Sequence, residues 1–155
     1  MSGRCIAVVL LALFTVPSSA AKGPNRIEGR WENPKHTTQV DVRVCGEGPD
    51  YCAVVLKASP NTQENARKGG TLQFIGTEIL RVHDTGDGTF RGTAFDPETN
   101  MHVGATVQMA GPGVMEVKGC AMMGLVCEAQ AWTKVNEAAL SSSRARKRRK
   151  TVVRR

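Results

Sequence analysis

Residues 79–95 read Ile79-Leu80-Arg81-Val82-His83-Asp84-Thr85-Gly86-Asp87-Gly88-Thr89-Phe90-Arg91-Gly92-Thr93-Ala94-Phe95, and this stretch decides the fold. Two short runs, 79–82 and 89–95, flank a turn that contains two glycines. Glycine adopts positive φ without strain, so the turn suits a tight hairpin. The stretch therefore predicts two antiparallel strands joined by a short connection.

The same pattern continues on both sides of this hairpin. Val40, Val42 and Val44 alternate with charged residues, as in a strand with one buried and one solvated face. No sustained helical period runs along the body, and the polar loop 59–70 is expected to hold a single helical turn around residues 64–67. The other expected strands are 52–56, 72–75, 102–109, 114–118 and 128–134, with turns at 96–100 and 111–113.

These eight or nine short strands predict an all-β fold. The simplest arrangement is a small antiparallel meander that closes into a barrel and so removes its exposed edges. An open sandwich is the alternative. A barrel of about eight strands either fills with side chains or holds one small ligand, and the sequence leaves that choice open.

The composition is typical of a soluble globular protein, with 41% hydrophobic, 23% charged and 5% aromatic residues. It excludes a disordered chain and a multi-span membrane protein. A chain of 155 residues has material for one core but not for two. We therefore expect one domain, residues 21–135, which excludes a large cofactor enzyme.

Residues 1–20 have the three parts of a secretory signal peptide. Arg4 supplies a positive charge, residues 5–14 an apolar run, and Ser18 and Ala20 the small side chains that precede cleavage. We expect cleavage after Ala20, with Ala21 as the second choice. A membrane anchor is the alternative, although the apolar run is shorter than the ~20 residues that span a bilayer. The leader predicts a periplasmic or secreted protein.

The mature chain carries four cysteines, an even number that suits an oxidising compartment. Each pair has six residues between its members, and turn residues favour the pairing Cys45–Cys52 with Cys120–Cys127. The functional alternative is a copper site, because Cys120, Met122, Met123 and Cys127 carry the soft sulfur ligands that Cu(I) prefers. We favour the disulfides and predict no metal and no cofactor.

The C-terminal tail, residues 136–155, holds eight of the 21 lysines and arginines, which makes the tail alone strongly basic. A block of like charge without apolar partners is expected to be disordered. Behind a secretion signal, its polyanionic partners are envelope surfaces and not nucleic acid. A solvated tail with no specific partner is the alternative. The expected anionic-surface residues are Arg144, Arg146, Lys147, Arg148, Arg149 and Lys150.

Five short motifs in order resemble the bacterial domain-of-unknown-function family numbered 2147. The resemblance covers about residues 27–135 and implies a secreted or periplasmic, lipocalin-like small β-barrel without an established activity. Two positions depart from the family pattern, Ala53 and Asn100, where glycine is usual. The motifs are Trp31-Glu32-Asn33-Pro34, Tyr51-Cys52 after Cys45, Gly92-Thr93-Ala94-Phe95-Asp96-Pro97-Glu98-Thr99, Val117-Lys118-Gly119-Cys120 and Gln130-Ala131-Trp132-Thr133-Lys134.

Candidate ligand-binding residues are the large aromatic side chains Trp31, Trp132 and Tyr51. The simpler interpretation is that the two tryptophans close the barrel near the chain ends. No nucleophile, phosphate-binding or zinc-protease motif is present, so we do not predict an enzyme. A hydrolase would need His83, Asp96 and His102 to meet across adjacent hairpins.

The leading hypothesis is a periplasmic, disulfide-bonded β-barrel that binds a small apolar or amphipathic ligand or an envelope component. The alternative is a filled barrel that acts as a structural or protein-interaction module of the envelope. The sequence leaves the oligomeric state open.

Overall fold

Alternating side chains and tight turns build the hairpin at residues 78–96. In the computed structural model, β4 (Glu78–Asp84) pairs with β5 (Thr89–Asp96) from Leu80 opposite Ala94 to Asp84 opposite Phe90. Gly86 and Gly88 have φ of 83° and 85°, values that glycine adopts without strain. The turn is closed by the amide of Thr85, which donates to the carbonyl of Thr89 at 3.0 Å.

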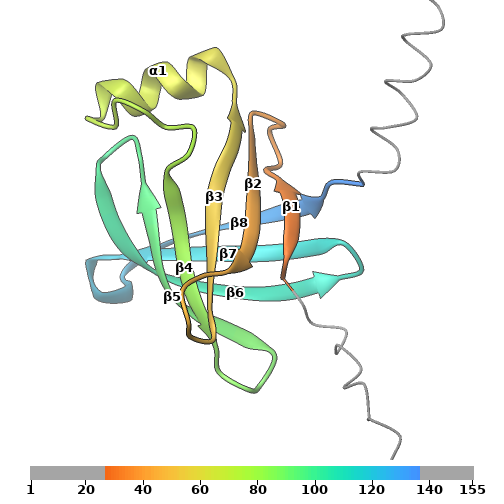
Figure 1. Ribbon diagram of the computed structural model, residues 1–155. Coiled ribbons are helices and arrows are strands. Elements are labelled where there is room, and N and C mark those ends of the chain that lie inside the picture. The colour runs from red at the N-terminus through yellow and green to blue at the C-terminus, as the bar shows by residue number, and fades with distance from the viewer. Residues whose placement is uncertain (1–26, 137–155) are drawn as a thin grey trace, which may run out of the picture.

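The structure describes residues 27–136, and eight antiparallel strands in this range close into a barrel in chain order (Figure 1). This confirms the predicted meander and its closure. The elements around the β4–β5 hairpin are β1 (Gly29–Glu32), β2 (Thr38–Val44), β3 (Asp50–Ala58), α1 (Pro60–Lys68), β6 (Met101–Gly111), β7 (Val114–Ala121), the 3₁₀ turn η1 (Met122–Gly124) and β8 (Val126–Lys134).

The meander gives the barrel two different ends. We call the end with α1, the β1–β2 and β5–β6 turns and η1 the helix end (Figure 1). The opposite end, with the other turns, the start of β1 and the end of β8, is called the terminal end. Closure is short, because β1 pairs with β8 only at Trp31–Lys134 and Glu32–Thr133. Residues 126–131 of β8 therefore have no partner on β1.

The core lies mainly along β1–β5 and reaches α1 at the helix end, where Ala66 and Phe74 are buried. Trp31 is fully buried, and its Nε1 donates to the carbonyl of Ile27 at 2.7 Å. The Nζ of Lys134 lies 5.4 Å from the centre of the Trp31 ring. Around this tryptophan the core consists of Ile27, Val40, Val42, Ala53, Val55, Ala66, Phe74, Leu80, Val82, Phe90, Ala105, Val107, Met115 and Trp132.

Two sequence expectations in the β3–β4 connection were wrong. The helix runs over nine residues, Pro60–Lys68, and not over one turn around 64–67. Ser59 caps it by accepting from the amide of Thr62 at 3.2 Å, and only Ala66 is buried, so the helix has no apolar stripe to reveal it.

The expected strand 72–75 is not a strand in the structure. Leu72 is 82% exposed and Phe74 is 5% exposed, so a single aromatic side chain anchors the segment. Two backbone hydrogen bonds tie the segment's end to β3, from Gly76 to Val55 at 2.8 Å and from Val55 to Thr77 at 3.0 Å.

Candidate ligand-binding site

On β5 and β7 the inward-facing side chains become smaller from the terminal end toward the helix end. Side chains alternate between the two faces of a strand, so the inward positions follow from the buried ones. On β5, Phe90 is buried, whereas Ala94, four residues on, is half-buried. On β7, Met115 is buried, and the inward positions Gly119 and Ala121 are half-buried. Toward the helix end, β5 and β7 thus carry small inward side chains, whereas β6 between them carries Val103 and Met101.

The inner face of β8 carries a polar pair beside this small-residue wall. Trp132 is 9% exposed and faces the core, so Gln130 and Glu128 share its face. Gln130 lies opposite Val117, and its Nε2 donates to Glu128 Oε1 at 3.2 Å. Both side chains are exposed because β1 does not extend along this part of β8. An apolar wall and one carboxylate–amide pair therefore meet at the open part of the barrel.

A groove of about 450 Å³ lies next to this region, where β6 and β7 separate. Their last pair is Gly104–Cys120, so residues 101–103 of β6 pair only with β5. The turn η1 borders the groove. The lining residues are Met101, His102, Val103, Gly104, Cys120, Ala121, Met122, Met123 and Gly124.

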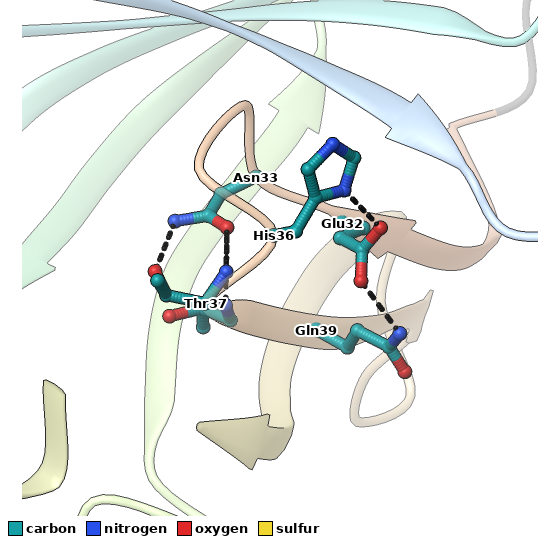
Figure 2. Close-up of polar contacts among 6 residues, drawn as sticks. Glu32, Asn33, His36, Thr37 and Gln39 are labelled. Carbon is teal, nitrogen blue, oxygen red and sulfur yellow. Dashed lines mark hydrogen bonds and ion pairs between the residues drawn. The ribbon is translucent and has the colours of Figure 1, made fainter. Parts of the chain in front are cut away.

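A polar cluster holds the β1–β2 turn (Figure 2). Asn33 Oδ1 accepts from the amides of Thr37 at 2.8 Å and Thr38 at 3.0 Å, and its Nδ2 donates to Thr37 Oγ1 at 3.0 Å. Glu32 accepts from Gln39 Nε2 at 2.8 Å and pairs with His36 Nδ1 at 2.6 Å. Each of these bonds joins residues of one turn, so the cluster stabilises the turn.

The hydrogen bonds lower the pKa of Glu32 below its ordinary value. The largest cause is the bond from Gln39, followed by the bond with His36, and burial acts in the opposite direction. Hydrogen bonds to the charged form favour that form. Glu32 is therefore ionised throughout the neutral range and attracts the imidazole of His36.

The three aromatic candidates occupy different places. Trp31 is enclosed in the core, with its indole N–H bonded to the backbone. Tyr51 is half-buried near the terminal end and meets Phe90 edge-on, with ring centres 5.4 Å apart. Of the three, Trp132 lies next to the open part of the barrel, two residues from Gln130 on the same face. The structure does not bring the three together around one space.

The residues of the hydrolase hypothesis do not form one site. His83 lies opposite Arg91, and His102 lies opposite Phe95, four residues further along β5. At about 3.3 Å per residue this separates them by roughly 13 Å. The two oxygens of Asp96 accept from the amide of Glu98 at 3.0 Å and the hydroxyl of Thr99 at 2.7 Å. Asp96 thus serves the β5–β6 turn.

Both predicted disulfides are present, Cys45–Cys52 and Cys120–Cys127. Cys120 and Cys127 face each other on β7 and β8, and their oxidised sulfurs are not thiolate ligands. The cysteine-based copper alternative is therefore excluded in this form. Across residues 27–136 no three His, Cys, Asp or Glu side chains gather in an arrangement that could hold a metal ion.

Several predictions concern parts of the chain beyond the described residues. The signal peptide (1–20) and the basic tail (136–155, of which only Asn136 is described) fall there. The tail residues Arg144, Arg146, Lys147, Arg148, Arg149 and Lys150 are included in this group. Among residues 27–136 no helix has the length and apolar character needed to cross a membrane.

Sequence reasoning missed the inward polar pair and half of the groove. Glu128 and Gln130 precede Trp132 by four and two residues, respectively, and this even spacing places all three side chains on the same face of the strand. Met101 and His102 had no such signal, because they border the groove only through the separation of β6 from β7.

Comparisons with known proteins agree with this architecture. A family described as "Uncharacterized protein conserved in bacteria" (DUF2147) matches residues 29–134. No curated protein is significantly similar to the chain. Among solved structures, protein HP1028 from the human pathogen Helicobacter pylori, described as belonging to the lipocalin family, is similar with a TM-score of 0.55 and 8% sequence identity. The alignment covers 76% of this chain and 88% of that protein, and at this identity it concerns the fold alone.

Proposed function

The chain belongs to the bacterial family DUF2147, and on this basis we propose that it is an extracytoplasmic lipocalin-like barrel that binds a small amphipathic ligand. The ligand would lie in the helix-end half of the barrel, between the small side chains of β5 and β7 and the polar pair of β8. The observation that carries the proposal is the pair Glu128–Gln130, exposed on an inner face that is otherwise apolar.

The chemistry of the wall indicates the kind of ligand. Ala94, Gly119 and Val117 are half-buried apolar residues, and Trp132 adds a large aromatic side chain that is 9% exposed. Ligand sites combine such apolar walls with a few polar groups that set orientation. Glu128 carries a negative charge and Gln130 offers an amide, so a neutral or cationic polar group fits better than an anionic one.

An extracytoplasmic location is supported by the two disulfides, which persist in oxidising compartments. The expected signal peptide supports the same location. Periplasm and the external medium both meet these conditions, and fractionation of the producing cell would distinguish them.

The ligand proposal is tested by titrating the protein with N-phenyl-1-naphthylamine, a neutral apolar dye that brightens in apolar surroundings. We expect saturable binding to the wild-type chain and at least tenfold weaker binding to Gly119→Leu. A Cβ at Gly119 would lie 3.3 Å from Val103 Cγ2, so the larger side chain occupies the proposed space.

The matched control is Lys118→Leu, which adds the same side chain at the exposed neighbouring position of β7. Near-ultraviolet circular dichroism verifies that both variants fold. Equal dye binding by both variants would contradict the proposed position. Failure of the folded wild-type chain to bind the dye and a series of neutral and cationic amphiphiles would favour the structural or protein-interaction alternative.

We also propose that the basic tail attracts the protein to anionic envelope surfaces. Each lysine or arginine near such a surface contributes about 1 kcal/mol, an attraction that salt screens. We expect the full chain to co-sediment with vesicles containing phosphatidylglycerol, but not with phosphatidylcholine alone, and to detach at high salt. Glutamine at the six positions 144 and 146–150 should abolish this binding.

The tail experiment has its control on α1, where Arg67→Gln with Lys68→Gln removes two exposed charges from the body. This variant should still co-sediment. Retained binding after loss of the tail charges would show that another surface is responsible.

A further inference from the structure

The methionines of this protein are unevenly placed. Met115 lies in the core, and Met109 is half-buried, as expected for a flexible apolar side chain. Met101, Met122 and Met123 instead border the groove between β6 and η1, and they are 55%, 71% and 103% exposed. Three thioethers are therefore available to solvent at one place.

The backbone of η1 is unusual at two of these residues. Met122 and Met123 have φ of 49° and 54°, in the left-handed region that glycine adopts more readily. Strained residues of this kind are concentrated at functional sites. The Cys120–Cys127 disulfide joins the strands on both sides of η1, and the amide of Leu125 donates to the carbonyl of Met122 at 3.2 Å. The turn thus holds two solvent-exposed methionines in one fixed conformation.

An imidazole borders the same groove. His102 packs against Phe95, with ring centres 5.0 Å apart. Within residues 27–136 neither ring nitrogen of His102 takes part in a hydrogen bond, which leaves a nitrogen lone pair for another partner. His102 and its neighbour Met101 on β6 both border the groove.

The donor atoms determine which ion fits. Thioether sulfur and imidazole nitrogen are ligands for soft monovalent metals, whereas Mg²⁺ and Ca²⁺ require oxygen. The groove has no carboxylate among its lining residues, and its one cysteine, Cys120, is oxidised. Zn²⁺ usually takes thiolate, imidazole or carboxylate, and the lining offers one imidazole.

We propose that the groove between β6 and η1 binds one Cu(I) or Ag(I) ion through the sulfurs of Met122 and Met123 and the imidazole of His102. Met101 borders the same groove and is not one of the three proposed ligands. This site differs from the amphipathic-ligand site, because it uses the start of β6 and the β7–β8 connection η1 and not the inner face of β8. The two proposals stand or fall separately.

Silver is the probe of choice, because Ag(I) binds the same ligands without a reductant that could open the disulfides. The full chain with Cys5→Ser, which removes the one cysteine outside the two disulfides, is labelled at the methionine methyl carbons and titrated with silver nitrate in a chloride-free buffer. We expect one ion per chain by native mass spectrometry. The methyl signals of Met122 and Met123 should shift, together with the His102 ring signals, while those of Met109 and Met115 stay in place.

The double variant Met122→Leu/Met123→Leu keeps the apolar volume and removes both sulfurs. It should bind Ag(I) at least a hundredfold more weakly, and His102→Gln at least tenfold. Met109→Leu and His83→Gln are the matched controls and should bind like the wild type. Intact mass before each titration verifies both disulfides.

Two outcomes would overturn the proposal. The first is unchanged affinity in the double variant. The second is a general shift of all methionine methyls without a defined stoichiometry, which would indicate scattered association of silver with the protein.

Discussion

At the scale of single residues, Glu32 shows how a partly exposed carboxylate acquires a role in the fold. It accepts from Gln39 on β2 and from His36 in the turn, and these bonds lower its pKa. A carboxyl group whose pKa is lowered by folding stabilises the folded state at pH above its unfolded pKa. That stabilisation is lost as the pH falls through the folded pKa.

The lowered pKa of Glu32 gives a prediction for the pH dependence of the free energy of unfolding. Glu32→Gln should make the free energy of unfolding less dependent on pH between about pH 5 and pH 3, because the titrating group is gone. Urea unfolding at several pH values measures the slope. Glu47→Gln, in the exposed β2–β3 turn, is the control and should keep the wild-type slope. A slope in Glu32→Gln as steep as in the wild type would show that this carboxylate is not responsible.

Small residues and large residues divide the barrel interior. At Gly92 a Cβ would overlap the carbonyl oxygen of Arg81, so β4 and β5 approach as closely as they do only with glycine there. Four residues separate the terminal-end core at Phe90 from the half-buried Ala94. The inward side chains of β5 therefore become smaller toward the helix end, which is the end at which we propose that the ligand binds.

At the scale of elements, α1 shows a helix specified by its ends. Ser59 accepts from the amide of Thr62 at 3.2 Å, and Pro60 occupies the first turn, where its missing N–H costs nothing. After the helix, Thr71 Oγ1 donates to the carbonyl of Pro97 at 3.1 Å, which ties this connection to the β5–β6 turn. The helix is therefore held by its cap and by this neighbouring turn.

Removing the cap should weaken this element measurably. Ser59→Ala should lower the free energy of unfolding by about 1 kcal/mol, because the amide of Thr62 loses its acceptor. Ser59→Asn supplies another acceptor and should retain most of the stability. Urea unfolding followed by circular dichroism measures both variants. Equal stability of alanine and asparagine at this position would contradict the capping role.

At the scale of the whole molecule, the two neighbours of β8 pair with it over very different lengths. β7 and β8 pair at eight positions, from Val114–Thr133 to Ala121–Val126, whereas β1 and β8 pair at two. Only one side of β8 is therefore hydrogen-bonded over residues 126–131. The edge of β8 that faces β1 is therefore exposed to solvent over residues 126–131.

Amide hydrogen exchange should reveal this edge. The amides of residues 126–131 that point away from β7 should exchange at least about a hundredfold faster than those that join β3 to β4, since unpaired edges open at little free-energy cost. Amides of β8 that point toward β7 are the internal reference and should be protected. Uniform protection along both sides of β8 would show that another segment covers this edge.

The amino-acid sequence by itself determined most of the strands and turns and both cysteine pairs, although the expected strand 72–75 is absent and β1 was not expected. Alternation at residues 40–44 and glycines at 86 and 88 are local patterns that leave few other structures open. The cysteine pairs were equally local, because each closes a single turn between adjacent strands. Only one turn of helix α1 was expected, because its one buried side chain, Ala66, makes no periodic pattern that would reveal the full length.

The tertiary structure alone decided where the barrel is filled and where it opens. Trp31 and Trp132 belong to the core because strands far apart in the chain pack around them. Glu128 and Gln130 are accessible because β1 is too short to cover β8, and His102 lies beside η1 because β6 and β7 separate after Gly104. These features depend on the lengths and registers of paired strands, which arise when the barrel closes and are properties of no single segment.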